Sequence, residues 1–385
     1  MFNKLKPIFV ILIATIIVVV TIPFKSVVLQ FVSAMLHNRD YILDIGTISP
    51  NVKYVTCDPK NKIFLLITVR DFRGNVVPRA RVDLNVRDGV GTVSQKHVVT
   101  DGNGECIVTY IPPSITDDSV SPLFEGQDLD ALVCAKLYKG KKEKQLKFGI
   151  RRIPIVYVHG YQENKDIFNS MSNYFEEKGY IGEFFSYDSS QKVENNAKDI
   201  AKFLEELKMK YLNEGLKVKS FDVVCHSMGG LVVRYYTCSS LYWEANDINK
   251  IVFISTPHKG SPVAQIGISL YDDDGVKDLE PEGELIGEKF PSMFNKGLNN
   301  KIETLNMLGQ YDEVVAFDAA SLDEWGIKTE LYNVGENNLT INSLLDGSFI
   351  SAENHKNILS NMKVFKRIEE FLNRREKTPI YLKQK

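Results

Sequence analysis

Cysteine is scarce in this chain, and neither sign of charge dominates. Five cysteines in 385 residues are too few for a miniature fold held by disulfides, and no C-x-x-C pair offers a structural zinc site. Lys and Arg total 47 against 49 for Asp and Glu, which gives a net charge of -2. The chain has no overall basic field, so its composition argues against a nucleic-acid-binding protein.

Long uncharged runs are equally rare, and the one that stands out lies at the N-terminus. Lys4 and Lys6 precede residues 7–24, whose 18 side chains carry no charge and are just enough to cross a membrane as a helix. The positive flank predicts a signal anchor that exports the rest of the chain. A cleaved signal peptide and a buried core helix are the alternatives. We therefore assign residues 1–40 to an anchor or signal segment, and the protein to an extracytoplasmic location, membrane-anchored or secreted.

The next part of the chain alternates between apolar and polar residues over short stretches. Residues 63–69 have the pattern of a buried strand, and residues 81–86 and 105–110 alternate with a period of two. Turns rich in Gly, Asn, Asp and Pro separate these runs. The pattern predicts an all-β sandwich of the immunoglobulin-like kind over residues 41–151.

From residue 152 the hydrophobic pattern changes and predicts strands that alternate with helices. The expected strands are 153–158, 181–187, 221–225, 251–254 and 331–334, and the expected helices are 167–178, 193–211 and 362–372. This order predicts an α/β fold, a mostly parallel sheet with helices on both faces. We place this body at residues 152–375, with an insertion at 262–328 and a tail at 376–385. At about 230 residues it is large enough to fold without the sandwich.

One segment of this body points to chemistry. Residues 221–233 (FDVVCHSMGGLVV) run from a hydrophobic strand through Ser227 into a helix, which is the context of a nucleophile elbow. The elbow strains the serine backbone and requires small neighbours on both sides. Gly229 meets this requirement, whereas Cys225 stands where glycine is usual.

The same turn predicts an oxyanion hole. Met228 opens the helix after the serine, so its backbone N–H can stabilise a developing negative charge. The second donor is expected from the loop after residues 153–158, and the N–H of Tyr161 is the candidate. The His159 side chain in that loop is predicted to be structural.

Three segments together resemble the α/β-hydrolases of the bacterial lipase and esterase kind, including the branch related to GPI inositol-deacylases. They are residues 158–161 (VHGY), 225–230 (CHSMGG) and 255–261 (STPHKGS). The resemblance covers more than half of the chain. It implies a Ser–acid–His triad in that chain order, without a metal or an organic cofactor.

A second resemblance concerns the sandwich. Residues 69–78 and 100–104 resemble the bacterial immunoglobulin-like repeats of invasin- and intimin-type proteins. The implied role is a spacer or a contact with the cell envelope. Only one copy of the repeat is present.

The triad order narrows the choice of base and acid. Of the two histidines that follow Ser227 beyond the elbow, His258 lies in a segment that resembles a structural turn, and His355 stands just before the last helix. His355 is therefore the predicted base. The predicted acid is Asp346, in a stretch that resembles the one before the catalytic histidine of related lipases, and Glu336, just after the strand at 331–334, is the alternative.

These residues predict a serine hydrolase that cleaves carboxylic esters, a lipase or esterase acting on ester or lipid substrates through an acyl-enzyme. An amidase, a thioesterase or an acyltransferase would use the same triad. A cell-envelope binding protein with an inactive hydrolase body is the alternative of another class. The insertion at 262–328 is expected to form a cap over the active site or an ordinary surface excursion.

Overall fold

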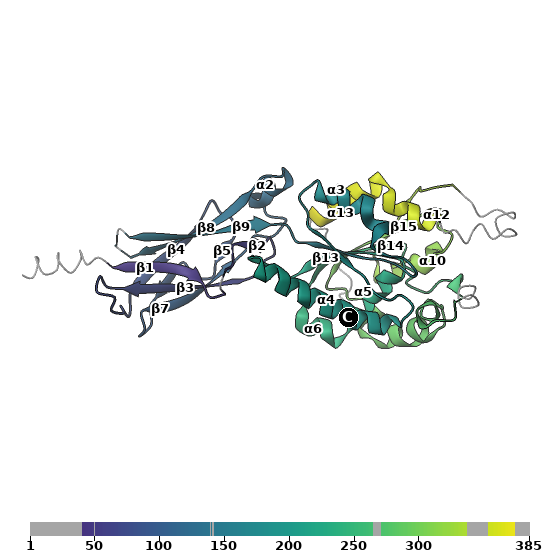
Figure 1. Cartoon of the computed structure of the whole chain (residues 1–385), viewed down its shortest axis with the longest axis horizontal. Coiled ribbons are helices and arrows are strands. Elements are labelled where there is room, and N and C mark those ends of the chain that lie inside the picture. Colours follow the sequence, from purple (N-terminus) through teal and green to yellow (C-terminus); the bar gives the residue numbers. More distant parts are fainter. Residues whose placement is uncertain are drawn as a thin grey trace, which may run out of the picture.

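The computed structural model describes residues 41–49, 51–138, 140, 142–264, 271–336 and 353–373. The described residues form an elongated molecule, with a β-sandwich at one end and an α/β body at the other (Figure 1). Within these ranges no helix has the length and apolar character needed to cross a membrane. The expected membrane segment at 7–24 lies outside them.

The N-terminal part is a sandwich of two sheets. Its strands are β1 (Ile42–Thr47), β2 (Tyr54–Thr56), β3 (Ile63–Arg70), β4 (Arg81–Arg87), β5 (Thr92–Val93), β6 (His97–Val99), β7 (Glu105–Ile111), β8 (Leu129–Leu137) and β9 (Glu143–Arg151). One sheet has the order β1-β3-β7-β5, and the other contains β2-β9-β8-β4-β6. A short helix, α2 (Ser121–Phe124), precedes β8.

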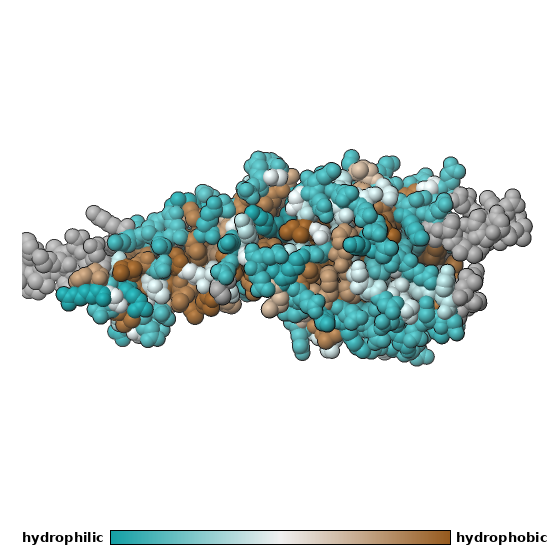
Figure 2. All heavy atoms as spheres, in the orientation of Figure 1, coloured by the Kyte–Doolittle hydropathy of each residue, from teal (hydrophilic) through white to brown (hydrophobic). Residues whose placement is uncertain are grey.

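The alternation seen in the sequence forms the sandwich core. Along β3, Ile63, Leu65 and Ile67 are buried, while Phe64 between them is exposed, because successive side chains of a strand point to opposite faces. The exposed face of this sheet also carries Ile107 of β7, and Figure 2 shows hydrophobic residues on the surface of the sandwich. The predicted all-β N-terminal part is confirmed.

The α/β body contains one six-stranded sheet in which all neighbours are parallel, in the order β11-β10-β13-β14-β15-β16. The strands of the body are β10 (Ile155–Val158), β11 (Gly182–Phe185), β12 (Leu216–Lys217), β13 (Phe221–His226), β14 (Ile248–Ile254), β15 (Glu303–Gly309) and β16 (Thr329–Tyr332). Its α-helices are α3 (Asn169–Glu176), α4 (Val193–Asn213), α5 (Met228–Cys238), α6 (Ser240–Ala245), α8 (Asp274–Lys277), α9 (Phe290–Ser292), α10 (Phe317–Ala320), α12 (Glu353–Asn357) and α13 (Met362–Asn373).

Helices cover both faces of this sheet. Figure 1 shows α3 and α13 on one face and α4, α5 and α6 on the other. Every residue of β10 and β13 is buried, as expected for parallel strands with helices on both sides. The order of strands and helices and the strand–serine–helix turn described below make this body an α/β-hydrolase fold, as the sequence predicts.

One strand of the sheet, β15, differs from the sequence-based expectation. It lies within residues 262–328, which we expected to be an insertion outside the sheet, yet it pairs with β14 on one side and β16 on the other. The strand escapes recognition because it carries a polar residue, Asn306, in its buried middle. The Asn306 amide donates to the backbone oxygen of Ala320 and to the hydroxyl of Thr329, which satisfies it inside the core.

The two parts of the chain share a sheet. Strand β12 of the α/β body pairs in parallel with β2, so the second sandwich sheet has the full order β12-β2-β9-β8-β4-β6. Beside this pair, the Ser220 hydroxyl donates to Asp58 at 2.7 Å, and the Asn61 amide donates to the backbone oxygen of Lys217 at 2.7 Å. The α/β body is thus joined to the sandwich through a shared sheet, whereas its length alone had suggested a body that folds without the sandwich.

Candidate active site

Ser227 lies at the turn between β13 and α5. Its backbone has φ 52° and ψ -128°, a conformation that non-glycine residues adopt rarely and that costs free energy. The Ser227 N–H donates to the backbone oxygen of Ile254 at 2.9 Å, which ties the turn to β14. This is the geometry expected of a nucleophile elbow.

The small neighbours of Ser227 are needed for close approach. A Cβ on Gly229 would lie 2.4 Å from the backbone oxygen of His159, so only glycine lets α5 pack this near the loop after β10. A Cβ on Gly160 would lie 2.8 Å from the Cβ of Ser227. Cys225 replaces the usual glycine without conflict, because its side chain is buried within the sheet and its thiol donates to the Val252 oxygen.

The loop after β10 lies beside this elbow. Tyr161 directly follows Gly160, and its hydroxyl donates to Asp273 at 2.6 Å, which fastens the segment around α8 to the loop. Met228 is the first residue of α5, and the first N–H groups of a helix have no partner within it. The structure thus brings the two predicted oxyanion donors, Tyr161 and Met228, to the surroundings of Ser227.

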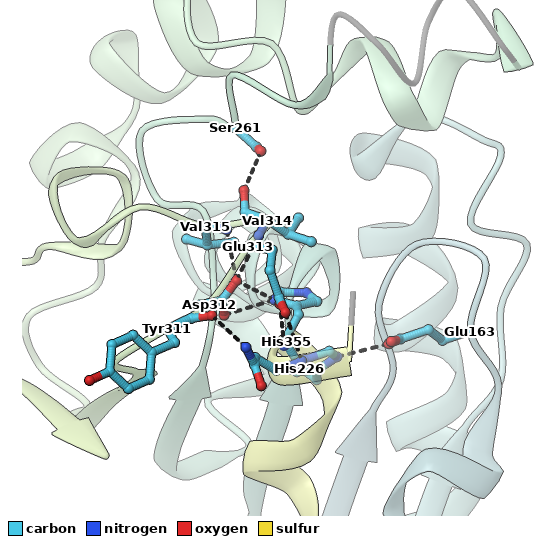
Figure 3. A network of polar contacts seen from close by, with 10 residues as sticks. Glu163, His226, Ser261, Tyr311, Asp312, Glu313, Val314, Val315 and His355 are labelled. Carbon is cyan, nitrogen blue, oxygen red and sulfur yellow. Dashed lines mark hydrogen bonds and ion pairs between the residues drawn. The ribbon is translucent and has the colours of Figure 1, made fainter. Parts of the chain in front are cut away.

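His355 lies in α12 and is buried. Its Nδ1 is 3.0 and 2.9 Å from the two carboxylate oxygens of Asp312, in the loop after β15 (Figure 3). The Asp312 carboxylate also accepts the backbone N–H groups of Val314 and Val315. These backbone hydrogen bonds fix the position of the Asp312 carboxylate beside the imidazole. His226, the residue before Ser227, lies with its ring centroid 4.5 Å from that of His355, which places His355 against the elbow.

The acid is the point at which the structure departs from the sequence analysis. Asp346 lies outside the described residues. Glu336 contributes its backbone oxygen, which accepts the Asn354 amide at 2.8 Å, and makes no recorded side-chain contact with His355 among the described residues. The carboxylate that does pair with His355 is that of Asp312, which the sequence analysis did not name. We had looked for the acid after β16, because β15 was not recognised as a strand.

Glu313 holds the backbone of the same histidine. Its two carboxylate oxygens accept the N–H groups of Asn354 and His355 at 3.3 and 3.2 Å, at the start of α12. Two consecutive acidic residues thus hold His355. Asp312 contacts its imidazole, and Glu313 accepts its backbone N–H. Asp312 comes three residues after Gly309, the last residue of β15, so its position has meaning only once that strand is recognised.

The electrostatics of the pair favour a charged imidazole. Burial lowers the pKa of His355, but the carboxylates of Asp312 and Glu163 more than compensate, so its pKa lies above the ordinary value of 6.5. Burial raises the pKa of Asp312, but the nearby His355 and Ser255 side chains and the backbone hydrogen bond from Val315 together outweigh this, so the net pKa lies below the ordinary value of 3.8. This arrangement stabilises the imidazolium that forms when His355 accepts a proton.

Two other histidines, His258 and His159, are held by packing and hydrogen bonds away from the Asp312–His355 pair. The main-chain oxygen of His258 accepts from Arg234 at 2.8 Å, and burial holds the pKa of this histidine well below its usual range. His159 stacks on Tyr187 with ring centroids 4.4 Å apart, and the Tyr187 hydroxyl donates to its backbone oxygen. The structural role predicted for His159 is confirmed. In the described part of the chain no group of three His, Cys, Asp or Glu side chains is arranged to hold a metal ion.

One protein-family model matches the part of the chain that contains the elbow. Residues 150–274 match the model described as the PGAP1-like alpha/beta domain. The matched segment contains Tyr161, Ser227 and Met228, whereas Asp312 and His355 follow it. The chain thus combines an α/β-hydrolase fold, whose first part is similar to this family, with a β-sandwich.

Three solved structures show distant likenesses. The lipase BlEst2 of Bacillus licheniformis has 16% identity and a TM-score of 0.42, covering 57% of this chain and 91% of its own. The phospholipase PlaB of Legionella pneumophila has 15% identity and a TM-score of 0.37, covering 57% of this chain and 61% of its own. The adhesin InvE of Yersinia pseudotuberculosis has 15% identity and a TM-score of 0.22, covering 29% of this chain and 32% of its own. Among the curated proteins no match is found.

Proposed function

We propose that this protein is a serine hydrolase that cleaves carboxylic esters through a triad of Ser227, Asp312 and His355. The observation that carries the proposal is the buried Asp312–His355 pair against a serine in a strained strand-to-helix turn. Asp312 replaces Asp346 and Glu336 as the proposed acid, because its carboxylate is the one on the imidazole.

In the proposed reaction the Ser227 hydroxyl attacks the ester carbonyl while His355 takes its proton. The negative charge on the carbonyl oxygen is stabilised by the N–H groups of Met228 and Tyr161. The protonated His355 then donates to the leaving alcohol, and an acyl-serine remains. Water, deprotonated by the same histidine, releases the carboxylic acid and restores the Ser227 hydroxyl.

Replacing Ser227 with Ala tests this assignment. We expect the variant to lose labelling by a fluorophosphonate and to lose hydrolysis of p-nitrophenyl esters by a factor on the order of 10⁶. The fold should persist, because the hydroxyl makes no recorded hydrogen bond within the described residues. The matched control is Ser292→Ala, an exposed serine of α9, which should label and hydrolyse like the parent chain. Normal activity in the Ser227 variant would reject the proposal.

We also propose that the substrate is a lipid or another ester met outside the cytoplasm. The support is the uncharged run at 7–24 behind two lysines. Fractionation of cells that express the full chain, followed by sequencing of its mature N-terminus, tests this. A start at residue 1 in the membrane fraction supports an anchor, a start near Met35 supports secretion, and recovery in the cytoplasm contradicts export.

A further inference from the structure

A second carboxylate–histidine pair lies behind the triad. The Glu163 side chain is buried in the loop after β10, and one of its oxygens, Oε2, accepts both the N–H of Gly160 and the Nδ1 proton of His226, each at 2.8 Å. Gly160 precedes Tyr161, and His226 precedes Ser227. A single oxygen atom thus connects the oxyanion loop to the nucleophile elbow.

The other ring nitrogen of His226 reaches the base. Its Nε2 is 3.0 Å from the backbone oxygen of His355, and the His226 side chain is fully buried. Figure 3 shows His226 between Glu163 on one side and His355 on the other. Three parts of the active site, the loop of Tyr161, the elbow of Ser227 and the helix of His355, are therefore joined through two side chains.

Both ring nitrogens of His226 are engaged in this network. The backbone oxygen of His355 only accepts, so Nε2 carries the proton of that bond, and Nδ1 shares a proton with the Glu163 carboxylate. The two bonds together fix the orientation of the buried His226 ring.

We propose that the buried pair of Glu163 and His226 positions the oxyanion loop and the base around Ser227. This deepens the proposed function and rests on it. Neither residue contacts the reacting atoms in the proposed reaction, so both are positioning residues. A His226 ring that lost either bond would leave a buried polar group without its partner, which is destabilising.

The charges around the pair come from several elements. The groups that interact with Glu163, His226 or His355 are His159 in the loop after β10, Tyr187 after β11, and Asp312 and Glu313 after β15. Asp312 and Glu313 contact His355 directly and Glu163 contacts His226, so each imidazole has its own carboxylate.

The bonds of the pair can be measured without any assay of activity. In the full chain labelled with ¹⁵N-histidine, we expect one buried histidine whose ring N–H is protected from exchange with solvent, assigned to His226 by its loss in His226→Asn. In Glu163→Gln the carboxylate that holds the ring is gone, so this signal should shift and lose protection. A His226 ring whose protons exchange freely in the parent chain overturns the proposal.

The positioning role has a kinetic signature. Glu163→Gln keeps the shape of the side chain, and we expect kcat to fall by about 100-fold through misplaced groups, with KM changed less than about twofold. The control is Glu177→Gln, an exposed glutamate after α3, which should change neither constant. Full kcat in a folded Glu163→Gln chain overturns the proposal.

The two proposals fail in different ways. If Ser227 of the parent chain does not react with a fluorophosphonate, the hydrolase assignment fails, and the positioning role fails with it. If Ser227 reacts and esters are hydrolysed, but Glu163→Gln retains full kcat, the positioning role fails alone. If the variant does not fold, the histidine spectrum of the parent chain still shows by itself whether the His226 ring is held by its two bonds.

Discussion

At the scale of residues, the described part of the site is organised around carboxylates that hold histidines. Asp312 holds the imidazole of His355, Glu313 holds its backbone, and Glu163 holds His226. Ser227 and His355 were predictable from the sequence, because the elbow and the position before the last helix are local patterns. Asp312 was not, because its identification depends on which strand it follows, and that is a property of the assembled sheet.

Replacing the acid should disable the proposed reaction. In Asp312→Asn the amide cannot stabilise the imidazolium and favours the wrong tautomer of His355, so we expect kcat to fall by about 10⁴, as in serine proteases. The control is Asp318→Asn, an exposed aspartate of α10. Steady-state hydrolysis of a p-nitrophenyl ester measures the effect. Asp346→Asn and Glu336→Gln should retain most activity, and a crippled Asp346→Asn beside an active Asp312→Asn would return the role to Asp346.

The pH dependence of hydrolysis follows from the charge of His355. The base acts when neutral, and its pKa is raised above 6.5 by Asp312, with a further contribution from Glu163. Activity should therefore fall as the pH decreases through a midpoint above 6.5. In the residual activity of Asp312→Asn the midpoint should move to lower pH, because the charge that stabilises the protonated form is gone. A profile of kcat/KM against pH that keeps its midpoint in this variant would contradict the assignment.

At the scale of elements, periodic segments were predictable and β15 was not. Helix α13 buries Val364, Phe365 and Ile368, the apolar face that the spacing predicts, and the helix expected at 193–211 is α4. β15 was missed because the buried amide of Asn306 interrupts its apolar pattern, and the partners that satisfy the amide become visible only in the folded sheet. Because this strand was missed, we looked for the acid after β16 and not after β15.

The contact between α5 and the loop after β10 should be intolerant of added atoms. Gly229→Ala would place a methyl group 2.4 Å from the backbone oxygen of His159, so the helix or the loop must shift. We expect a loss of about 1–3 kcal/mol in the free energy of unfolding and a loss of activity. Urea denaturation measures the first. Gly102→Ala, where nothing lies within 4 Å, is the control and should be neutral. If Gly229→Ala is as stable as the parent chain, the loop after β10 can move away from the added methyl group without a cost in free energy, which would contradict this prediction.

At the scale of the whole molecule, the sandwich and the α/β body share one sheet. Gly215 accepts the N–H groups of Lys53 and Tyr54 at 2.8 and 3.0 Å beside the β12–β2 pair, and Arg152 donates to the Leu123 oxygen of the sandwich at 2.7 Å. The sequence suggested two independent units, since each had a plausible core of its own. Strand β12 has only two residues, which is too short for a hydrophobic pattern. The sequence therefore could not show that the α/β body adds a strand to a sheet of the sandwich.

Removing the sandwich should weaken the α/β body. A chain that begins at residue 152 leaves β12 without β2 and exposes the Ser220 hydroxyl that Asp58 accepts. We expect a lower melting temperature than that of residues 41–385, with residual esterase activity at low temperature, because the proposed triad lies after the cut. Differential scanning fluorimetry of the two chains measures the difference. Equal melting temperatures would mean that the shared sheet contributes no stability.

The direction of β13 has a consequence for what the protein can reach. This strand begins at the joint with the sandwich, where Ser220 meets Asp58, and ends at Ser227, so the nucleophile lies at the pole away from the sandwich, roughly 20 Å further along the strand. Strand β1 starts at the opposite pole, because Ile42 pairs with the far end of β3 (Figure 1). If the chain is anchored in a membrane through the residues before β1, Ser227 would lie at the end of the molecule far from that membrane. The proposed site would then reach esters in the surrounding medium or on an opposing surface more readily than the lipids of the anchoring membrane.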